Sequence, residues 1–275
     1  MVSRSFVAAA GQRELPSLYN KKDYHMIRIY YMKLSSDCSQ EQSLALLYGT
    51  NKMIAFPGSR EEMYQCLPKE RKDAVDRAKN ETVALKRLCA GAFLQHVLGE
   101  EMGIPMERFV YTYNEWGKPE LDKEEMLETF VYTEEERRVI QGVHFNLSHS
   151  GDYVVLAIGS SPVGIDVEHK TKGYDTLPKR CFCEEEYEDI LQAGDERAQK
   201  IRFLEYWTMK EAYIKCVGEG MRIPLNSFLV KGEKDDIAIM KKMSGDERLE
   251  PVCGSTLWLD SDYCVSVCRV ANSYD

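Results

Sequence analysis

The chain has 275 residues, with 36 lysines and arginines against 45 aspartates and glutamates, for a formal net charge of −9. Its length suits one large domain or two smaller ones, and its 44% hydrophobic and 29% charged residues are ordinary for a globular protein. This composition excludes a disordered, collagen-like or coiled-coil chain. The negative charge argues against nucleic acid as the main partner, because no overall positive field exists to neutralise phosphates.

The pattern of cysteines and the length of the apolar runs indicate the cellular compartment of the protein. The nine cysteines are scattered without a C-x-x-C pair, which predicts reduced thiols rather than a disulfide framework or a zinc site. The run from Phe6 to Ala10 is too short for the core of a signal peptide. The run from Tyr153 to Ile158 is too short to span a bilayer. We therefore expect a cytoplasmic protein that does not engage a membrane.

The first part of the chain combines an irregular leader with strand and helix patterns. Residues 1–25 have no sustained periodicity, and we expect them to lie outside the fold, with Met26 as a hypothetical true start. Residues 26–32 alternate like a strand. Residues 67–98 have helical spacing, as one helix or two abutting ones, and Gly99 is expected to end this run. The stretch 120–136 holds eight carboxylates and one lysine and predicts a solvated, partly helical excursion.

The second part of the chain predicts strands around two helices. The expected elements are a hairpin of residues 153–158 and 163–168, helices over 184–193 and 196–217, and a C-terminal hairpin of 257–259 and 263–270. Asp152-Tyr153 and Asp262-Tyr263 open similar strands. This echo hints at two related α+β halves.

Two acidic residues in the strand 163–168 are candidate metal ligands. Asp166 and Glu168 stand at i and i+2, so both carboxylates leave the same face, about 7 Å apart at the Cα level. Ile165 and Val167 point the other way, into the core. Carboxylate oxygens of this kind suit Mg²⁺. Taken alone, however, the short pattern favours an ordinary edge strand with its polar face outward.

The helix 203–217 carries charge where a plain core helix would avoid it. Lys210 falls inside its apolar arc, Glu211 at the edge of the arc, and Lys215 one turn beyond Glu211. A buried charge is costly unless it is paired or coordinates a metal. A surface pair of Glu211 with Lys215 is the alternative interpretation, but it leaves Lys210 unexplained.

Two further segments are rich in hydrogen-bond donors. The stretch His144-Phe145-Asn146-Leu147-Ser148-His149-Ser150-Gly151 predicts a polar turn suited to phosphate oxygens, although an ordinary capped turn explains it equally well. Upstream, Gly117-Lys118-Pro119 predicts a turn that presents one lysine.

Taken in order, these segments resemble the phosphopantetheinyl transferases, specifically the surfactin-synthetase-activating (Sfp-type) branch. The resemblance rests on Gly117-Lys118-Pro119, Phe145 to Ser150, Gly164 to Glu168, and Trp207 to Lys215, with a weaker match at Arg87 and Gly91. It covers roughly residues 26–270. Each motif alone is unspecific, whereas four motifs in the family's order make coincidence improbable.

The resemblance implies an α+β fold of two similar α/β halves related by a pseudo-twofold, with the active site in the cleft between them. We expect the halves to be residues 26–150 and 151–275, the second carrying the metal site. The implied reaction transfers 4′-phosphopantetheine from coenzyme A to a serine of an apo acyl, peptidyl or polyketide carrier protein, releasing 3′,5′-ADP with the help of Mg²⁺. The implied enzyme is a monomer.

The resemblance also implies roles for single residues. Asp166, Glu168 and Glu211 match the Mg²⁺ ligands. The residues that match positions near coenzyme A are Arg87, Lys118, Pro119, Ser148, His149 and Lys215. Glu186 matches an acidic residue near the metal in relatives, and Lys210 lies in the helix motif without an implied role.

The base that deprotonates the carrier serine stays open between Glu211, a metal-bound water and Lys215. Two other functions also remain: a Mg²⁺-dependent phosphohydrolase that uses the same carboxylates, and a module that binds coenzyme A or a carrier protein without catalysis. Hydrolysis of coenzyme A without a carrier protein would identify the first, and binding without turnover would identify the second.

Overall fold

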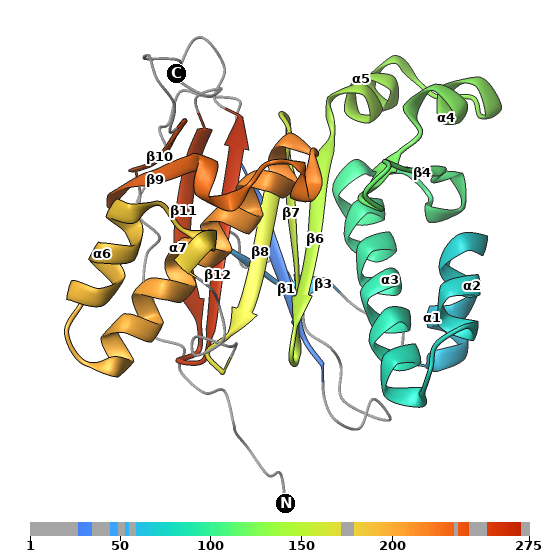
Figure 1. Cartoon of the computed structure of the whole chain (residues 1–275). Helices are drawn as coiled ribbons and strands as arrows, with labels where there is room; N and C mark the ends of the chain where they lie inside the picture. The colour runs from blue at the N-terminus through green and yellow to red at the C-terminus, as the bar shows by residue number, and fades with distance from the viewer. Residues whose placement is uncertain are drawn as a thin grey trace, which may run out of the picture.

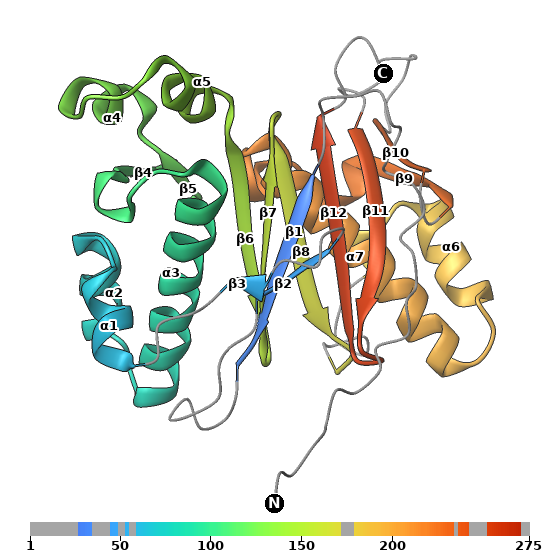
Figure 2. The ribbon, with the colours of Figure 1, turned by 180° about the vertical axis from the view of Figure 1, so that it is seen from behind.

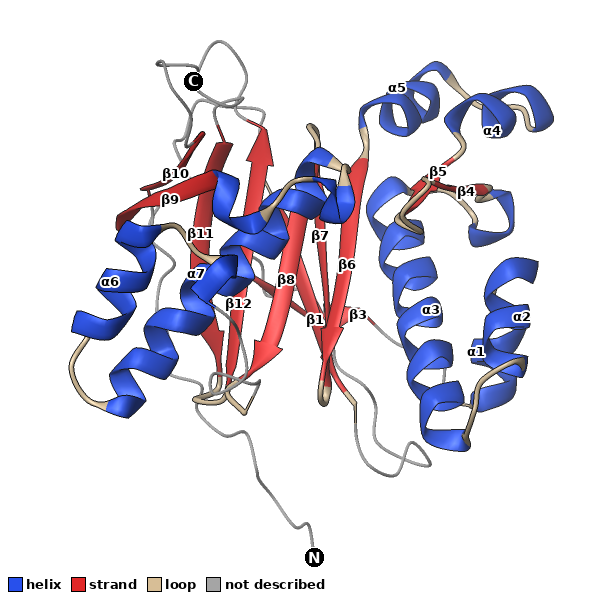
Figure 3. Cartoon of the chain, in the orientation of Figure 1, coloured by secondary structure: helices blue, strands red, loops and turns tan. Residues whose placement is uncertain are grey.

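Strands form the centre of the molecule and helices flank them (Figures 1 and 3). The computed structural model describes residues 27–34, 45–48, 53–54, 59–171, 179–233, 236–241 and 252–270. The expected leader 1–25 and the hypothetical start at Met26 lie outside the described residues. None of the helices described is long and apolar enough to cross a membrane.

The first sheet has five antiparallel strands in the order β3-β2-β1-β7-β6. The strands are β1 (Arg28–Lys33), β2 (Ala45–Tyr48), β3 (Met53–Ile54), β6 (His144–Ser150) and β7 (Tyr153–Gly159). The strand expected over 26–32 is therefore β1. Figure 2 shows β1 crossing next to β7.

The second sheet also has five antiparallel strands, in the order β8-β12-β11-β10-β9. They are β8 (Val163–His169), β9 (Phe228–Glu233), β10 (Asp236–Lys241), β11 (Val252–Leu259) and β12 (Tyr263–Val270). The predicted C-terminal hairpin is confirmed, because β11 and β12 pair up to Leu259 and Tyr263. A separate short pair joins β4 (Tyr111–Tyr113) to β5 (Pro119–Leu121).

The hairpin predicted for 153–158 and 163–168 is wrong, although both strands exist. β7 has β1 on one edge and β6 on the other, so neither edge is left for β8. β8 instead pairs with β12, and the turn between β7 and β8 carries the chain from one sheet to the other. Strand alternation indicates each strand but not its partner.

Seven α-helices complete the described part of the chain. They are α1 (Arg60–Gln65), α2 (Lys69–Asp76), α3 (Glu81–Met102), α4 (Lys123–Thr129), α5 (Glu134–Gly142), α6 (Glu184–Gln192) and α7 (Glu196–Val217). The two C-terminal helices and the partly helical acidic excursion are confirmed. The predicted end at Gly99 is wrong: α3 continues to Met102 because Gly103, with φ of 64°, adopts the left-handed conformation that ends it.

The two parts of the chain repeat one arrangement, as expected for two similar α+β halves. Strands β1-β7-β6 in the first sheet correspond to β8-β12-β11 in the second. Helices α3 and α7 both have 22 residues, and each ends at a left-handed glycine, Gly103 or Gly218. The division at residue 150 stays a prediction, and the pairing of β7 with β1 and β6 favours a boundary after Gly159.

Clusters of buried hydrophobic side chains hold these layers together. Helix α3 packs on the first sheet, with Phe93 and Leu94 in one cluster with Leu156. Helix α7 covers one face of the second sheet, as the opposite views of Figures 1 and 2 show. The other face of the second sheet meets the first sheet in a cluster that includes Ile165 and Val167. The prediction that these two side chains enter the core is confirmed.

Helix α7 approaches β8 so closely that Gly164 has no room for a side chain. A Cβ at Gly164 would lie 1.9 Å from the Ala212 carbonyl oxygen and 2.4 Å from the Cys216 amide nitrogen, and backbone atoms cannot move aside as a flexible side chain can. We expect Gly164→Ala to lower the free energy of unfolding by about 3 kcal/mol or more, at the upper end of overpacking effects.

Urea denaturation of the purified variant measures this loss. Gly142→Ala is the control, since a Cβ at this helical position meets nothing within 4 Å. This change should be neutral or stabilise the protein by up to about 1 kcal/mol. Equal stability of the Gly164→Ala variant and the wild type would contradict the close approach of α7 to β8.

Candidate active site

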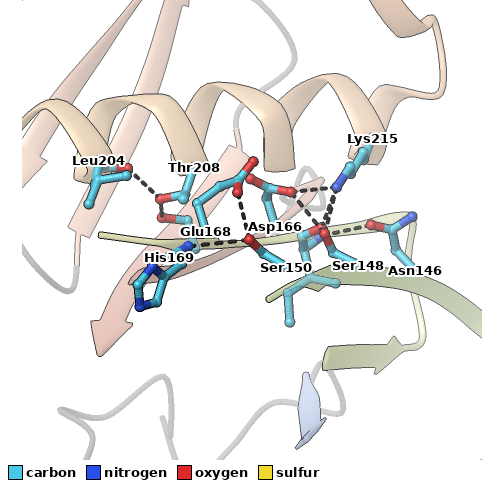
Figure 4. Close-up of polar contacts among 11 residues, drawn as sticks. Asn146, Ser148, Ser150, Asp166, Glu168, His169, Leu204, Thr208 and Lys215 are labelled. Atoms are coloured by element: carbon cyan, nitrogen blue, oxygen red, sulfur yellow. Dashed lines mark hydrogen bonds and ion pairs between the residues drawn. The ribbon is translucent and has the colours of Figure 1, made fainter. Parts of the chain in front are cut away.

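The edges of the two sheets meet where β6 lies beside β8 (Figure 4). Asn146 Oδ1 accepts a hydrogen bond from the Ile165 backbone N–H at 2.8 Å, and Ser150 Oγ accepts one from the His169 N–H at 3.3 Å. The polar turn predicted for 144–151 is wrong here, because residues 144–150 form β6. Phe145 and Leu147 alternate with the polar residues and pack in the core beside α3.

Asp166 is the most completely enclosed carboxylate at this junction, with 4% of its surface exposed. Its Oδ1 accepts hydrogen bonds from the Lys215 ammonium at 2.6 Å and from the Ser148 hydroxyl at 2.9 Å. Its Oδ2 is buried without a hydrogen-bond partner. Desolvation raises the pKa of Asp166, and Lys215 opposes this rise with its positive charge. The structure thus brings Asp166, Ser148 and Lys215 together.

Glu168 and Glu211 lie on surfaces that face each other across this junction. Glu168 is buried on the same face of β8 as Asp166, and its Oε2 accepts a hydrogen bond from Ser150 Oγ at 2.8 Å. Glu211 is half-buried on α7, one turn before Lys215. Thr208, one turn earlier, bonds to Ser266 Oγ at 2.7 Å, so this face of α7 is turned towards the second sheet.

The three predicted metal ligands are not gathered into a metal-binding group. In the described part of the chain, no set of three or more His, Cys, Asp or Glu side chains is arranged to hold a metal ion. The Lys215 ammonium supplies the positive charge beside Asp166 instead. The residues nevertheless fit a hard cation in one respect, since Asp166 Oδ2 is a buried carboxylate oxygen without a partner.

The Gly117-Lys118-Pro119 turn contacts the C-terminal end of α7. Gly117 has φ of 78°, the left-handed conformation that the turn between β4 and β5 requires. Lys118 Nζ donates to the Lys215 carbonyl at 2.8 Å, one of the last carbonyls of the helix, which have no partner within it. Desolvation lowers the pKa of Lys118. The predicted turn is confirmed, and its lysine caps the helix that carries Lys215.

Two family models match adjoining stretches of the chain. Residues 162–268 match the 4′-phosphopantetheinyl transferase superfamily model, and residues 59–161 match the model described as 4′-phosphopantetheinyl transferase, N-terminal. The chain belongs to the 4′-phosphopantetheinyl transferase superfamily. It is therefore an enzyme of the transferase class, and the expected family is confirmed.

Curated relatives place this phosphopantetheinyl transferase in the Sfp-type branch. The transferase gsp of Aneurinibacillus migulanus is 33% identical over 205 residues, which is 74% of this chain and 77% of the relative. The transferase Sfp of Bacillus subtilis is 29% identical over 200 residues, 72% and 80% of the two chains. A solved holo-[acyl-carrier-protein] synthase of Thermotoga maritima matches 40% of this chain and 64% of that chain, with 18% identity and a TM-score of 0.30.

The other residues of the transferase that are predicted to bind coenzyme A lie on three different elements. His149 is exposed on β6, and desolvation, with the charges of Lys215 and Lys86, lowers its pKa. Arg87 is exposed on α3 and donates to the Ala74 carbonyl at the end of α2. Pro119 begins β5 opposite Tyr113. Their contacts with coenzyme A stay predictions.

Lys210 and Glu186 form a buried ion pair in the transferase. Lys210 Nζ lies 2.8 Å from Glu186 Oε2, and both side chains are 0% exposed. Glu186 also accepts backbone N–H groups from Cys183 and Val230, and Lys210 donates to the carbonyls of Leu225 and Phe228. Lys210 is buried, as its place in the apolar arc predicts, and this ion pair accounts for its charge. Glu186 is held in this pair, and the position near the metal that the resemblance implies stays a prediction.

Asn114 is a contact between the halves of the transferase that sequence reasoning missed. Its Oδ1 accepts the N–H groups of Trp116 and Lys118, and its Nδ2 donates to the Gly218 carbonyl at 3.1 Å, just past the end of α7. Asparagine before a glycine turn is a common pattern. Its second partner lies 104 residues away and leaves no trace in local spacing.

Asn114→Asp should weaken this contact while leaving the turn intact. Aspartate keeps an acceptor for Trp116 and Lys118 but places a second oxygen against the Gly218 carbonyl, at the negative end of α7. We expect the free energy of unfolding in urea to fall by about 1–3 kcal/mol. Glu115→Gln, which removes only the exposed ion pair with Arg222, should cost less than about 1 kcal/mol. Equal losses in both variants would contradict a specific role for Asn114.

Proposed function

We propose that this transferase moves 4′-phosphopantetheine from coenzyme A to a serine hydroxyl of an apo carrier protein and releases 3′,5′-ADP. Membership of the superfamily supports the transferred group. The observation that carries the proposal is the buried junction of β6, β8 and α7, where Ser148, Asp166 and Lys215 meet within 2.9 Å. An ammonium, a hydroxyl and a partner-free carboxylate oxygen suit a reaction that moves a phosphoryl group.

We propose that Mg²⁺ is the cation that Asp166, Glu168 and Glu211 would hold. The buried Asp166 Oδ2 and the neighbouring Glu168 on the same face of β8 support two of these ligands. A bound Mg²⁺ would supply charge stabilisation to the pyrophosphate. Among the described residues no group of three is assembled, so binding of the cation would require the three side chains to come closer together.

The chain's own residues would orient the substrates. Lys215 is 28% exposed at its side chain, and we propose that its ammonium, beside Asp166, also binds the pyrophosphate. Ser148, His149, Lys118 and Arg87 are the further residues we propose to contact the phosphates of coenzyme A. Glu211 is the base we propose for the carrier serine; Lys215 is the alternative, and it would accept the proton only after its ammonium had lost one.

The proposed partner is an apo carrier protein of acyl, peptidyl or polyketide type. We also propose that the enzyme acts as a monomer in the cytoplasm, with neither nucleic acid nor a membrane as a partner. The scattered cysteines and the net charge of −9 support these last proposals. Size-exclusion chromatography with light scattering would test the oligomeric state.

The test of the proposed function is incubation of the full chain with coenzyme A, Mg²⁺ and a panel of apo carrier proteins. The expected result is a carrier whose intact mass rises by one phosphopantetheine, with 3′,5′-ADP released in equal amount. A carrier with its acceptor serine replaced by alanine is the control. Release of product from coenzyme A without a carrier would identify a phosphohydrolase, and binding without turnover would identify a non-catalytic module.

A further inference from the structure

The junction between the two sheets is built by side chains of β6. Asn146, Ser148 and Ser150 stand at i, i+2 and i+4, so all three leave β6 on the same side. Their partners on β8 are, in order, the Ile165 N–H, Asp166 Oδ1, and both Glu168 Oε2 and the His169 N–H. The contacts advance in the same direction on both strands, so β6 and β8 run parallel here (Figure 4).

These side chains accept hydrogen bonds from backbone N–H groups, as the carbonyl oxygens of a neighbouring strand do inside a sheet. In a continuous sheet, the Ile165 and His169 N–H groups would bond to carbonyl oxygens of the neighbouring strand. At this junction, Asn146 Oδ1 and Ser150 Oγ accept them instead. A buried N–H without a partner is costly, and Ile165 and Asn146 are both buried. Asn146 therefore ties β8 to β6 one residue before Asp166.

The Ser150 hydroxyl accepts one hydrogen bond and donates another, which fixes the direction of its O–H bond. A serine hydroxyl has one O–H donor and two acceptor positions. Ser150 Oγ accepts from the His169 N–H and donates its single proton to Glu168 Oε2 at 2.8 Å. Ser150 thus links Glu168 Oε2 to the His169 N–H of the same strand, and this fixes the position of the Glu168 carboxylate relative to the β8 backbone.

We propose that Asn146 and Ser150 are positioning residues of the transfer reaction, which hold Asp166 and Glu168 in place by joining β6 to β8. This inference rests on the proposed function, in which these carboxylates bind the divalent cation. Neither residue need touch the substrates. Removing a hydrogen-bond partner of a metal ligand typically costs about 10- to 100-fold in metal affinity or activity.

A matched pair of variants isolates the Ser150 hydroxyl. Ser150→Thr and Ser150→Val both branch the side chain at Cβ and have nearly the same shape, but threonine keeps the hydroxyl where valine has a second methyl group. We expect the valine variant to bind Mn²⁺ about 10-fold more weakly than the threonine variant, measured by electron paramagnetic resonance of Mn²⁺ alone. In the transfer assay, it should need a correspondingly higher Mg²⁺ concentration, with the KM for coenzyme A changed by less than about 2-fold.

A second pair tests Asn146 without using the reaction. Asn146→Asp keeps a side-chain acceptor for the Ile165 N–H, and Asn146→Leu removes it. We expect faster hydrogen exchange of the Ile165 amide in the leucine variant than in the aspartate variant. Ser227→Ala is the control for both pairs, since its hydroxyl bonds only locally to the Pro224 carbonyl. Melting temperatures show that each compared variant is folded.

The outcomes separate this inference from the proposed function. Equal Mn²⁺ affinity of the Ser150→Thr and Ser150→Val variants, in a protein that transfers phosphopantetheine normally, would overturn the positioning role. A wild-type chain that binds Mn²⁺ but transfers nothing to any carrier would overturn the proposed function. In that case, the affinity difference between the two variants and the Ile165 exchange rates would still show that Asn146 and Ser150 hold Asp166 and Glu168 in place.

Discussion

Replacing Asp166 with asparagine should reduce phosphopantetheine transfer by at least about 100-fold, the loss typical when one fixed charge is removed from a reacting phosphoryl or acyl centre. Asparagine has nearly the same shape and can still accept the Ser148 hydroxyl. It removes the negative charge beside Lys215 and the carboxylate oxygen Oδ2, which is buried without a partner. Both losses affect the groups proposed to hold the cation and to orient the pyrophosphate.

The same substitution should leave the protein folded. Burial raises the pKa of Asp166, so its folded-state pKa lies above its unfolded value and the charged form costs folding free energy at neutral pH. This cost falls as the pH falls through the raised pKa, and asparagine does not carry it at any pH. Asp166→Asn should therefore unfold in urea at a concentration no lower than the wild type at pH 7.

Transfer of a fluorescent coenzyme A analogue to the carrier measures the activity. Asp262→Asn serves as the control, because its exposed ion pair with Lys170 lies at the turn between β11 and β12, past the end of β8. This variant should react at the wild-type rate. A wild-type rate for Asp166→Asn at saturating Mg²⁺ would remove Asp166 from the proposed machinery.

Local sequence patterns predicted which strands and helices form near the site, but not which strands pair with each other. Alternation indicated that Asp166 and Glu168 share a face of a strand, and that strand is β8 with both side chains beneath α7. The same reasoning paired β8 with β7, whereas its backbone partner is β12. Short turns favour a hairpin, and only the occupied edges of β7 exclude one.

The polar motif around Ser148 shows why the rest of the site could not be predicted. Asn, Ser, His and Gly are typical of turns, so the composition of residues 144–151 outweighed their alternation. The structure makes them a strand because Phe145 and Leu147 reach the core on one side and the polar residues meet β8 on the other. Their partners are 18 or 19 residues away, beyond the reach of spacing rules.

The predicted position of Lys118 illustrates a further limit. The resemblance implied a phosphate contact, while in the structure its ammonium caps α7 at the Lys215 carbonyl and lies 3.9 Å from Glu120. A side chain of the first half thus supports the helix that presents Lys215 to Asp166. Because an ammonium has three N–H donors, Lys118 can keep the Lys215 carbonyl and still donate to a phosphate oxygen. A sequence motif identifies the lysine, but its partner depends on which groups the fold brings within its reach.

Breaking the buried pair of Lys210 and Glu186 should cause a large loss of stability. Lys210→Met should lower the free energy of unfolding by about 3–5 kcal/mol, because it leaves the Glu186 carboxylate 0% exposed without its positive partner. Two backbone N–H groups still bond to Glu186, but they do not neutralise it. The methionine also leaves the Leu225 and Phe228 carbonyls without the ammonium that they bind.

The double variant Lys210→Met with Glu186→Gln separates charge from hydrogen bonding. Glutamine retains an acceptor for a backbone N–H while removing the unpaired charge, so it should recover part of the loss seen in Lys210→Met alone. Urea denaturation of the two single variants and the double variant gives the coupling energy. A loss of less than about 1 kcal/mol in Lys210→Met would be typical of an exposed pair and would contradict the buried one.

Because Lys210 contacts α6 and the start of β9 rather than Asp166, the folded Lys210→Met variant should transfer phosphopantetheine at close to the wild-type rate. Lys210→Met should lower stability far more than activity, whereas Asp166→Asn should lower activity far more than stability. The Lys210–Glu186 pair of α7 stabilises the fold, and the Lys215–Asp166 pair belongs to the proposed active site.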